Sequence, residues 1–116
     1  MMRESQIRPQ GAAAYRRSLT PKQMEAEVFA RATRAIRNAA AGGGAALDLA
    51  RALEDNRRLW SAVHDAVLDP ENALPVPLRA QVAGVALAVM RECDAARPDL
   101  DFIIETNDNF AAGLWQ

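Results

Sequence analysis

The stretch from Pro77 to Arg91 constrains the fold of this chain more than any other. Between Val82 and Met90 no side chain is charged, and the only side-chain heteroatom is the methionine sulfur. A helix that is apolar on nearly all sides must be covered on nearly all sides. We therefore expect other helices to pack around this stretch, and any face that they leave open is available to a partner. The stretch is too short to cross a bilayer, which takes about 20 apolar residues.

The apolar residues of this stretch recur at helical spacing, which supports its interpretation as a helix. Leu87 and Met90 lie on the side opposite to the main stripe. The pattern therefore does not determine which side faces the protein interior. The main stripe consists of Leu78, Val82, Val85, Val89 and Cys93.

Composition indicates one small helical domain. The chain has 116 residues, half of them apolar, with many alanines and only six aromatic residues. A single cysteine excludes an internal disulfide and fits a reducing compartment. No apolar run follows a basic N-terminal segment, so we expect no signal peptide, no membrane insertion and a cytoplasmic location.

Charge is distributed unevenly along the chain. Residues 1–38 carry eight basic and three acidic side chains, whereas residues 92–116 carry one basic and six acidic ones. Either the two ends lie close together and compensate, or the basic end is an arm offered to a partner. The net charge of −1 argues against a dedicated nucleic-acid binder.

Capping and breaking signals predict an all-α fold, an antiparallel bundle of about four main helices. Thr20-Pro21 is a helix start, Gly42–Gly44 a helix stop, and Pro98 a break followed by a possible cap at Asp99. Asp69-Pro70 ends the helix before it, because the residue before proline disfavours the helical conformation. We expect residues 1–11 to be a flexible arm and residues 12–116 to be a single domain with helices at about 12–19, 20–41, 45–68, 77–96 and 99–113.

Periodicity also predicts the buried side of each long helix. The helix at 20–41 has its apolar stripe at Met24, Val28, Ala32, Ile36 and Ala39, widened by Phe29. The helix at 45–68 has its stripe at Ala46, Leu49, Leu53, Asn56, Trp60, Val63 and Val67. The last helix has its stripe at Leu100, Ile103, Ile104, Asn107, Phe110, Ala111 and Leu114.

No pattern of residues points to catalysis, a cofactor or a metal. His64 is the only histidine and Cys93 the only cysteine, and one of each makes no plausible zinc site. The glycines at 42–44 are not a phosphate-binding loop, because no strand precedes them and no Lys-Ser or Lys-Thr follows. We expect a protein that is not an enzyme and that has no cofactor.

Three asparagines stand at positions that call for hydrogen-bond partners. Asn56 and Asn107 interrupt apolar stripes, and Asn72 lies in a turn between two prolines. We interpret all three as structural clamps that bond neighbouring backbone or one another. The alternative is that they line a groove that receives a peptide.

These residues resemble the FlaF family of flagellar biosynthesis regulators. The resemblance spans about Tyr15 to Leu114. It rests on the order and spacing of Ser18-Leu-Thr-Pro21 with Glu25-Ala26 and Phe29, Asn56-Arg-Arg-Leu-Trp60, Pro70-Glu-Asn-Ala-Leu-Pro75 with Leu78-Arg79-Ala80, Leu87 with Val89-Met-Arg-Glu92, and Ile103-Ile-Glu105 with Asn107, Phe110, Gly113 and Leu114. Ala88, where the family often has an aromatic residue, and the glycines at 42–44 depart from the family pattern.

The resemblance implies a helical cytoplasmic protein that acts on flagellin, as a chaperone for the flagellar type III export apparatus. It also implies a link between flagellin synthesis and filament assembly, opposite the translational repressor FlbT. For a terminal amphipathic helix of flagellin we expect a groove. Its floor would be Trp60, Leu74, Val85, Val89 and Met90, with Arg57 and Arg79 at its rim. The alternative is that the apolar members of this set simply pack the bundle.

Two other functions remain open. The first is an RNA-binding regulator of flagellin message that uses the arginines of residues 3–37. Few aromatic residues are interleaved with those arginines, which makes nucleic acid an unlikely partner. The second is direct pairing with FlbT.

Overall fold

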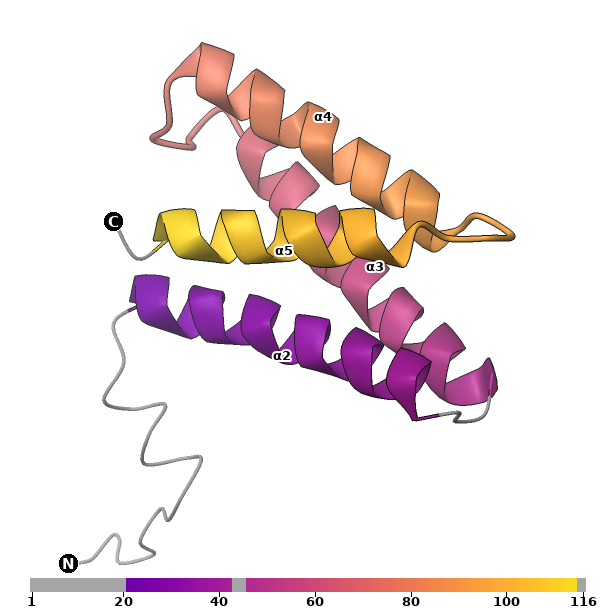
Figure 1. Ribbon diagram of the computed structural model, residues 1–116. Helices are drawn as coiled ribbons and strands as arrows, with labels where there is room; N and C mark the ends of the chain where they lie inside the picture. Colours follow the sequence, from indigo (N-terminus) through magenta and orange to yellow (C-terminus); the bar gives the residue numbers. More distant parts are fainter. Residues whose placement is uncertain (1–20, 43–45, 115–116) are drawn as a thin grey trace, which may run out of the picture.

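The computed structural model describes residues 21–42 and 46–114, and helices dominate both segments (Figure 1). The helices are α2 (Pro21–Ala41), α3 (Ala46–Leu68), α4 (Val76–Cys93) and α5 (Leu100–Leu114). No strand occurs in the described segments, so the predicted all-α bundle is confirmed. The expected arm at 1–11, the expected helix at 12–19 and the Thr20 cap lie outside the described residues.

The four helices pack as two pairs. α4 lies mainly against α3, and α5 lies mainly against α2, which also contacts α3. Successive helices run in opposite directions, and α4 and α5 diverge from the loop that joins them (Figure 1). Direct contact between α4 and α5 is consequently sparse.

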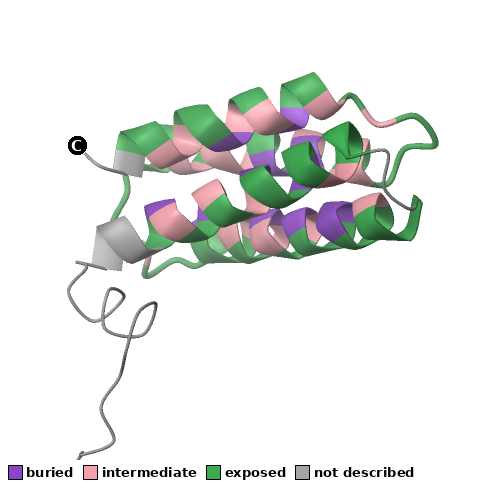
Figure 2. Cartoon of the chain, turned by 60° about the horizontal axis from the view of Figure 1, so that its bottom comes forward, coloured by how far each residue is buried: buried purple, intermediate pink, exposed green. Residues whose placement is uncertain are grey.

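The core forms where the inner sides of all four helices meet. The buried cluster includes Phe29, Ile36, Trp60, Val89 and Ile103, and buried positions lie on helix sides that face one another (Figure 2). The rings of Phe29 and Trp60 meet edge to face with centroids 5.3 Å apart. Phe110 packs 5.0 Å from each of them. This aromatic trio joins α2, α3 and α5, and such contacts contribute about 0.5–1.5 kcal/mol per pair beyond the area buried.

The predicted inner side is confirmed for α3 and α5 and confirmed in part for α2. Asn56 and Trp60 of α3 and Ile103 and Asn107 of α5 are fully buried. In α2 the predicted Phe29 and Ile36 are buried, together with Ala26 and Thr33, whereas the predicted Val28 is 40% exposed. Phe29 is the largest apolar side chain in this part of α2, and its packing against Trp60 leaves Val28 at the edge of the buried side.

The prediction that the third main helix continues to about Ala96 is wrong, because α4 ends at Cys93. Asp94 bonds back to the Met90 carbonyl, and the Glu92 carboxylate then accepts a hydrogen bond of 2.8 Å from the backbone N–H of Asp99. These bonds turn the chain before Pro98 is reached. Asp99 caps α5 as predicted, since its carboxylate accepts a 3.0 Å bond from the N–H of Phe102.

The loop between α3 and α4 is held by its own polar groups. The amide of Asn72 donates to the carbonyl of Ala66 and accepts from the N–H of Leu74, both at 2.9 Å. Asn72 thus joins the last turn of α3 to the turn that leads into α4. Pro77 lies in the first turn of α4, where proline costs the helix no hydrogen bond.

None of the described helices is long and apolar enough to traverse a lipid bilayer.

Candidate functional site

A groove of about 830 Å³ runs between α4 and α5, where the two helices diverge. Its α4 wall runs from Ala80 to Ala88, and its α5 wall from Phe102 to Phe110. The nine residues from Ala80 to Ala88 span eight steps of the helix, a rise of about 12 Å along α4. The groove is open to solvent along this length and mostly apolar.

Small residues create the α4 wall. Ala80, Gly84 and Ala88 follow one another at intervals of four, so they lie on one side of the helix. A Cβ atom placed on Gly84 would meet no heavy atom within 4 Å. The space beside Gly84 is therefore empty surface, and it belongs to the groove.

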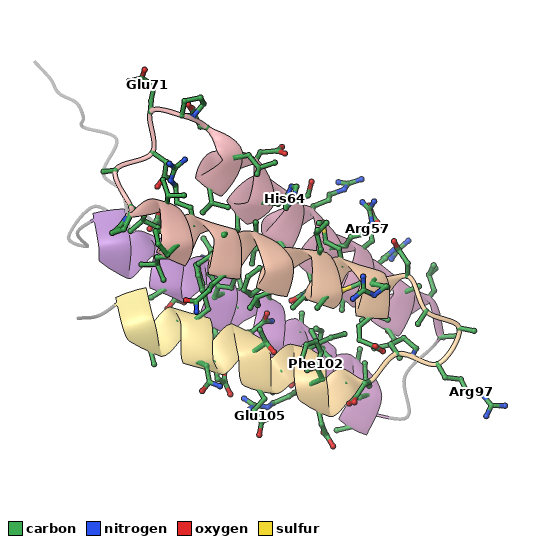
Figure 3. All side chains as sticks on the ribbon, turned by 90° about the horizontal axis from the view of Figure 1, so that it is seen from above. Arg57, His64, Glu71, Arg97, Phe102 and Glu105 are labelled. Carbon is green, nitrogen blue, oxygen red and sulfur yellow. The ribbon has the colours of Figure 1, made fainter. Side chains whose placement is uncertain are left out.

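The remaining lining is a patch of larger apolar groups edged by amides. Val85 of α4 is 40% exposed, and Phe102 of α5 lies between the two helices at the other end (Figure 3). Gln81 and Asn109 are exposed polar residues of the lining. The hydroxyl of Thr106, which also lines the groove, donates to the Phe102 carbonyl at 2.7 Å. An apolar centre with a polar rim is typical of a surface that binds another protein.

A chain of buried hydrogen bonds lies beneath the groove and joins the three helices around it. The indole N–H of Trp60 donates to Oδ1 of Asn107 at 2.7 Å, and the Asn107 amide donates to Oδ1 of Asn56 at 2.6 Å. The Asn56 amide then donates to Sγ of Cys93 at 3.6 Å. α3, α4 and α5 are thereby linked although α4 and α5 touch little.

Cys93 is the last member of this series of hydrogen bonds, and its thiol is half-buried. Burial raises the pKa of Cys93 above its ordinary value, and the hydrogen bond from Asn56 offsets only part of that rise. The thiol form is therefore favoured at neutral pH, and the group acts as a weak acceptor rather than as a nucleophile.

Comparison with known protein families gives one match, to the family described as flagellar protein FlaF, over residues 10–114. The chain belongs to the FlaF family. No curated protein and no solved structure matches it significantly. The FlaF match extends over all the residues that line the groove and over the buried chain of hydrogen bonds beneath it. The family assigns the chain to the flagellar system.

The five residues predicted as the groove floor of this FlaF chain do not come together in one surface. Val85 and Trp60 both line the α4–α5 groove, and Trp60 lies at its bottom because the side chain is fully buried. Val89 is fully buried in the core, and Met90 is half-buried against the same core. Leu74 lines a different groove, between α2 and α3. Val89 therefore offers no accessible contact surface, because its side of α4 faces α3.

Neither arginine predicted for the rim lines the α4–α5 groove. Arg57 pairs with Asp94 at 3.1 Å and ties α3 to the end of α4. Arg79 donates to the carbonyls of Leu74, Asp69 and Val67, at 3.1, 3.3 and 3.5 Å. Arg79 therefore satisfies carbonyls at the C-terminal end of α3, where a cation is also favoured by the helix dipole. Both contacts are structural.

The α5 wall and the small residues that open the groove were not among the predicted site residues. Phe102, Thr106 and Asn109 fall on the side of α5 that the apolar stripe leaves outside. Ala80, Gly84 and Ala88 are not part of the apolar stripe predicted for α4. Their spacing of four residues could have indicated the groove, because it places three small side chains in a row on one side of the helix.

We expect replacement of Gly84 with alanine to stabilise the fold by about 0.5–1 kcal/mol. Glycine inside a helix costs about this much relative to alanine, and the added methyl group meets nothing. Urea denaturation followed by circular dichroism measures the change, with Ala80→Gly as the reverse exchange one turn earlier. A loss of stability in Gly84→Ala would mean that the methyl group is not accommodated as the open space around Gly84 predicts.

Proposed function

We propose that this FlaF protein binds flagellin as an export chaperone, and that the α4–α5 groove holds a terminal amphipathic helix of flagellin. Binding in the cytoplasm would link flagellin synthesis and secretion to filament assembly. The proposed activity is binding without catalysis. The observation that carries the proposal is the open apolar groove, with small residues on one wall and Val85 and Phe102 exposed in it.

The shape of the groove suits a helix. One turn of an α-helix with side chains occupies roughly 420–610 Å³, from a diameter of about 10–12 Å and a pitch of about 5.4 Å. A groove of about 830 Å³ thus accommodates the volume of roughly 1.4 to 2 turns. Because a docked helix inserts only one side, the contact would extend over more turns than that.

The polarity of the groove suits capture followed by release. A chaperone must cover the apolar side of its client and give it up later at the export apparatus. Gln81 and Asn109 provide exposed amides at the rim, and the groove is open rather than enclosed. An interface of this kind is more easily undone than a fully desolvated apolar one.

An RNA-binding role has less support from the described arginines. Arg34 pairs with Glu27 at 3.3 Å, and Arg37 pairs with Asp108 at 3.1 Å. The second pair joins α2 to the acidic helix α5, which favours compensation between the two charged ends over a free basic arm. An affinity for flagellin mRNA that falls steeply as the salt concentration rises would support the RNA-binding hypothesis instead.

We expect Gly84→Leu and Val85→Asp to weaken flagellin binding by roughly tenfold or more, which is about 1.4 kcal/mol or more. The leucine fills the groove and the aspartate places a charge on its apolar wall. Isothermal titration with a polymerisation-incompetent flagellin measures the affinity. Flagellins that lack either terminal helix identify the bound segment.

Leu87→Asp is the matched control, because Leu87 is 47% exposed on α4 but does not line the groove. Equal weakening by Leu87→Asp and Val85→Asp would place the binding surface elsewhere on α4. Full affinity in Gly84→Leu would exclude the groove. If flagellin does not bind at all, the same titration with FlbT tests the pairing alternative.

A further inference from the structure

A second, smaller groove of about 440 Å³ lies between α2 and α3 on the other side of the aromatic trio. It is lined from α2 by Val28 and Phe29, from α3 by Leu59 and Val63, and from the following loop by Leu74. Val28 is 40% exposed and Leu74 is 42% exposed, and the lining is almost entirely apolar. This groove leaves apolar surface in water that the four described helices do not cover.

The position of the groove relative to the chain indicates what covers it. Its α2 wall consists of Glu25, Val28 and Phe29, within the first nine residues of a helix that begins at Pro21. The described chain therefore enters α2 at one end of this groove, and 20 residues of sequence precede that point. The FlaF match starts at residue 10, so the residues just ahead of α2 belong to the shared family sequence.

We propose that residues 12–19 form a short helix that folds back along α2 and fills the α2–α3 groove. Their sequence is Ala-Ala-Ala-Tyr-Arg-Arg-Ser-Leu, in which Tyr15 and Leu19 stand four residues apart on one helical side. Tyr15 and Leu19 are the groups that enter the groove. The inference is independent of flagellin binding and concerns the protein's own fold.

The dimensions agree with this arrangement. Tyr15 and Leu19 are separated by a rise of about 6 Å, the same rise that separates Glu25 from Phe29 along the wall. With the chain reversing at Thr20, Leu19 comes level with the first turn of α2 and Tyr15 comes level with Glu25. The Tyr15 side chain tilts toward the N-terminus of its own helix, so it extends into the groove toward Phe29. A tyrosine and a leucine are apolar enough to bury there, and the phenol hydroxyl can stay at the edge in water.

Charge agrees as well. Residues 12–19 contain Arg16 and Arg17 and no acidic residue. Among the described residues that line the groove, Glu25 is the only charged one. A basic segment next to Glu25 is favoured over an acidic one, and the attraction is weakened by salt.

Amide hydrogen exchange of the full-length protein, read by mass spectrometry at peptide resolution, tests the proposal. We expect the amides of residues 16–19 to exchange roughly tenfold or more slowly than those of an unstructured peptide. In Val28→Asp this protection should disappear. In Val85→Asp, which changes an equally exposed valine in the α4–α5 groove, it should remain.

Unstructured exchange rates for residues 12–19 in the unaltered protein would overturn the proposal. Equal protection in Val28→Asp and Val85→Asp would mean that the segment docks elsewhere, and would overturn it too. Protection that grows with protein concentration would identify a second copy as the donor of the helix, again against the proposal. If Val28→Asp loses protection in α5, and hence the fold itself, Leu74→Asp in the loop replaces it as the groove variant.

Discussion

Replacement of Trp60 with alanine is expected to destabilise the protein by about 3–5 kcal/mol. Trp60 is fully buried, and its ring contacts both Phe29 and Phe110. The substitution removes the centre of the aromatic trio and leaves a cavity between three helices. Because small domains are stable by only about 5–15 kcal/mol, a loss of this size removes a large share of the free energy of unfolding.

Urea denaturation followed by circular dichroism at 222 nm measures this loss. Trp60→Phe is expected to fall between the wild type and Trp60→Ala, because it keeps an aromatic ring but loses the indole N–H. Leu87→Ala removes an exposed leucine of α4 and should change the stability by less than about 0.5 kcal/mol. A similar loss in Leu87→Ala and Trp60→Ala would contradict the core that the structure describes.

Replacement of Asn107 with leucine is expected to destabilise the protein by about 2–6 kcal/mol, although leucine is the more hydrophobic residue. Asn107 accepts from the indole of Trp60 and donates to Asn56, and both partners are fully buried. The substitution leaves a buried N–H and a buried carbonyl without their bonds. Each such group costs about 1–3 kcal/mol.

Asn109→Leu is the matched control on the same helix, because Asn109 is exposed. Its stability should stay within about 0.5 kcal/mol of the wild type. The double variant Asn56→Leu/Asn107→Leu should cost less than the sum of the two single variants, since the bond between the two amides can be lost only once. Additive losses would show that the two asparagines act independently.

The two grooves share a wall, which relates the proposed binding site to the proposed N-terminal helix. Phe110 lines both grooves and packs on Phe29 and Trp60 between them. Val28→Asp changes the α2–α3 groove and Val85→Asp changes the α4–α5 groove. Each variant therefore serves as the control for the other in tests of flagellin binding and of protection in residues 16–19.

Much of the helical framework was predictable because its signals are local. Asp99 caps α5 through a bond to a residue three positions away, and Asn72 bonds atoms within six residues of itself. The inner sides of α3 and α5 were also predictable, because each has polar residues on the opposite side to define a stripe. Periodicity is a reliable guide when a helix has one apolar side.

The four described helices, most of their ends and the inner sides of α3 and α5 follow from local patterns in the sequence. Which side of α4 is covered depends on packing between helices, because a helix that is apolar all round contains no periodicity from which to choose. Packing against α3 buries Ala86 and Val89 and leaves Val85 and Leu87 exposed. The candidate site was decided in the same way, since a groove between α4 and α5 depends on how far two helices diverge, and no pattern within either helix specifies that distance.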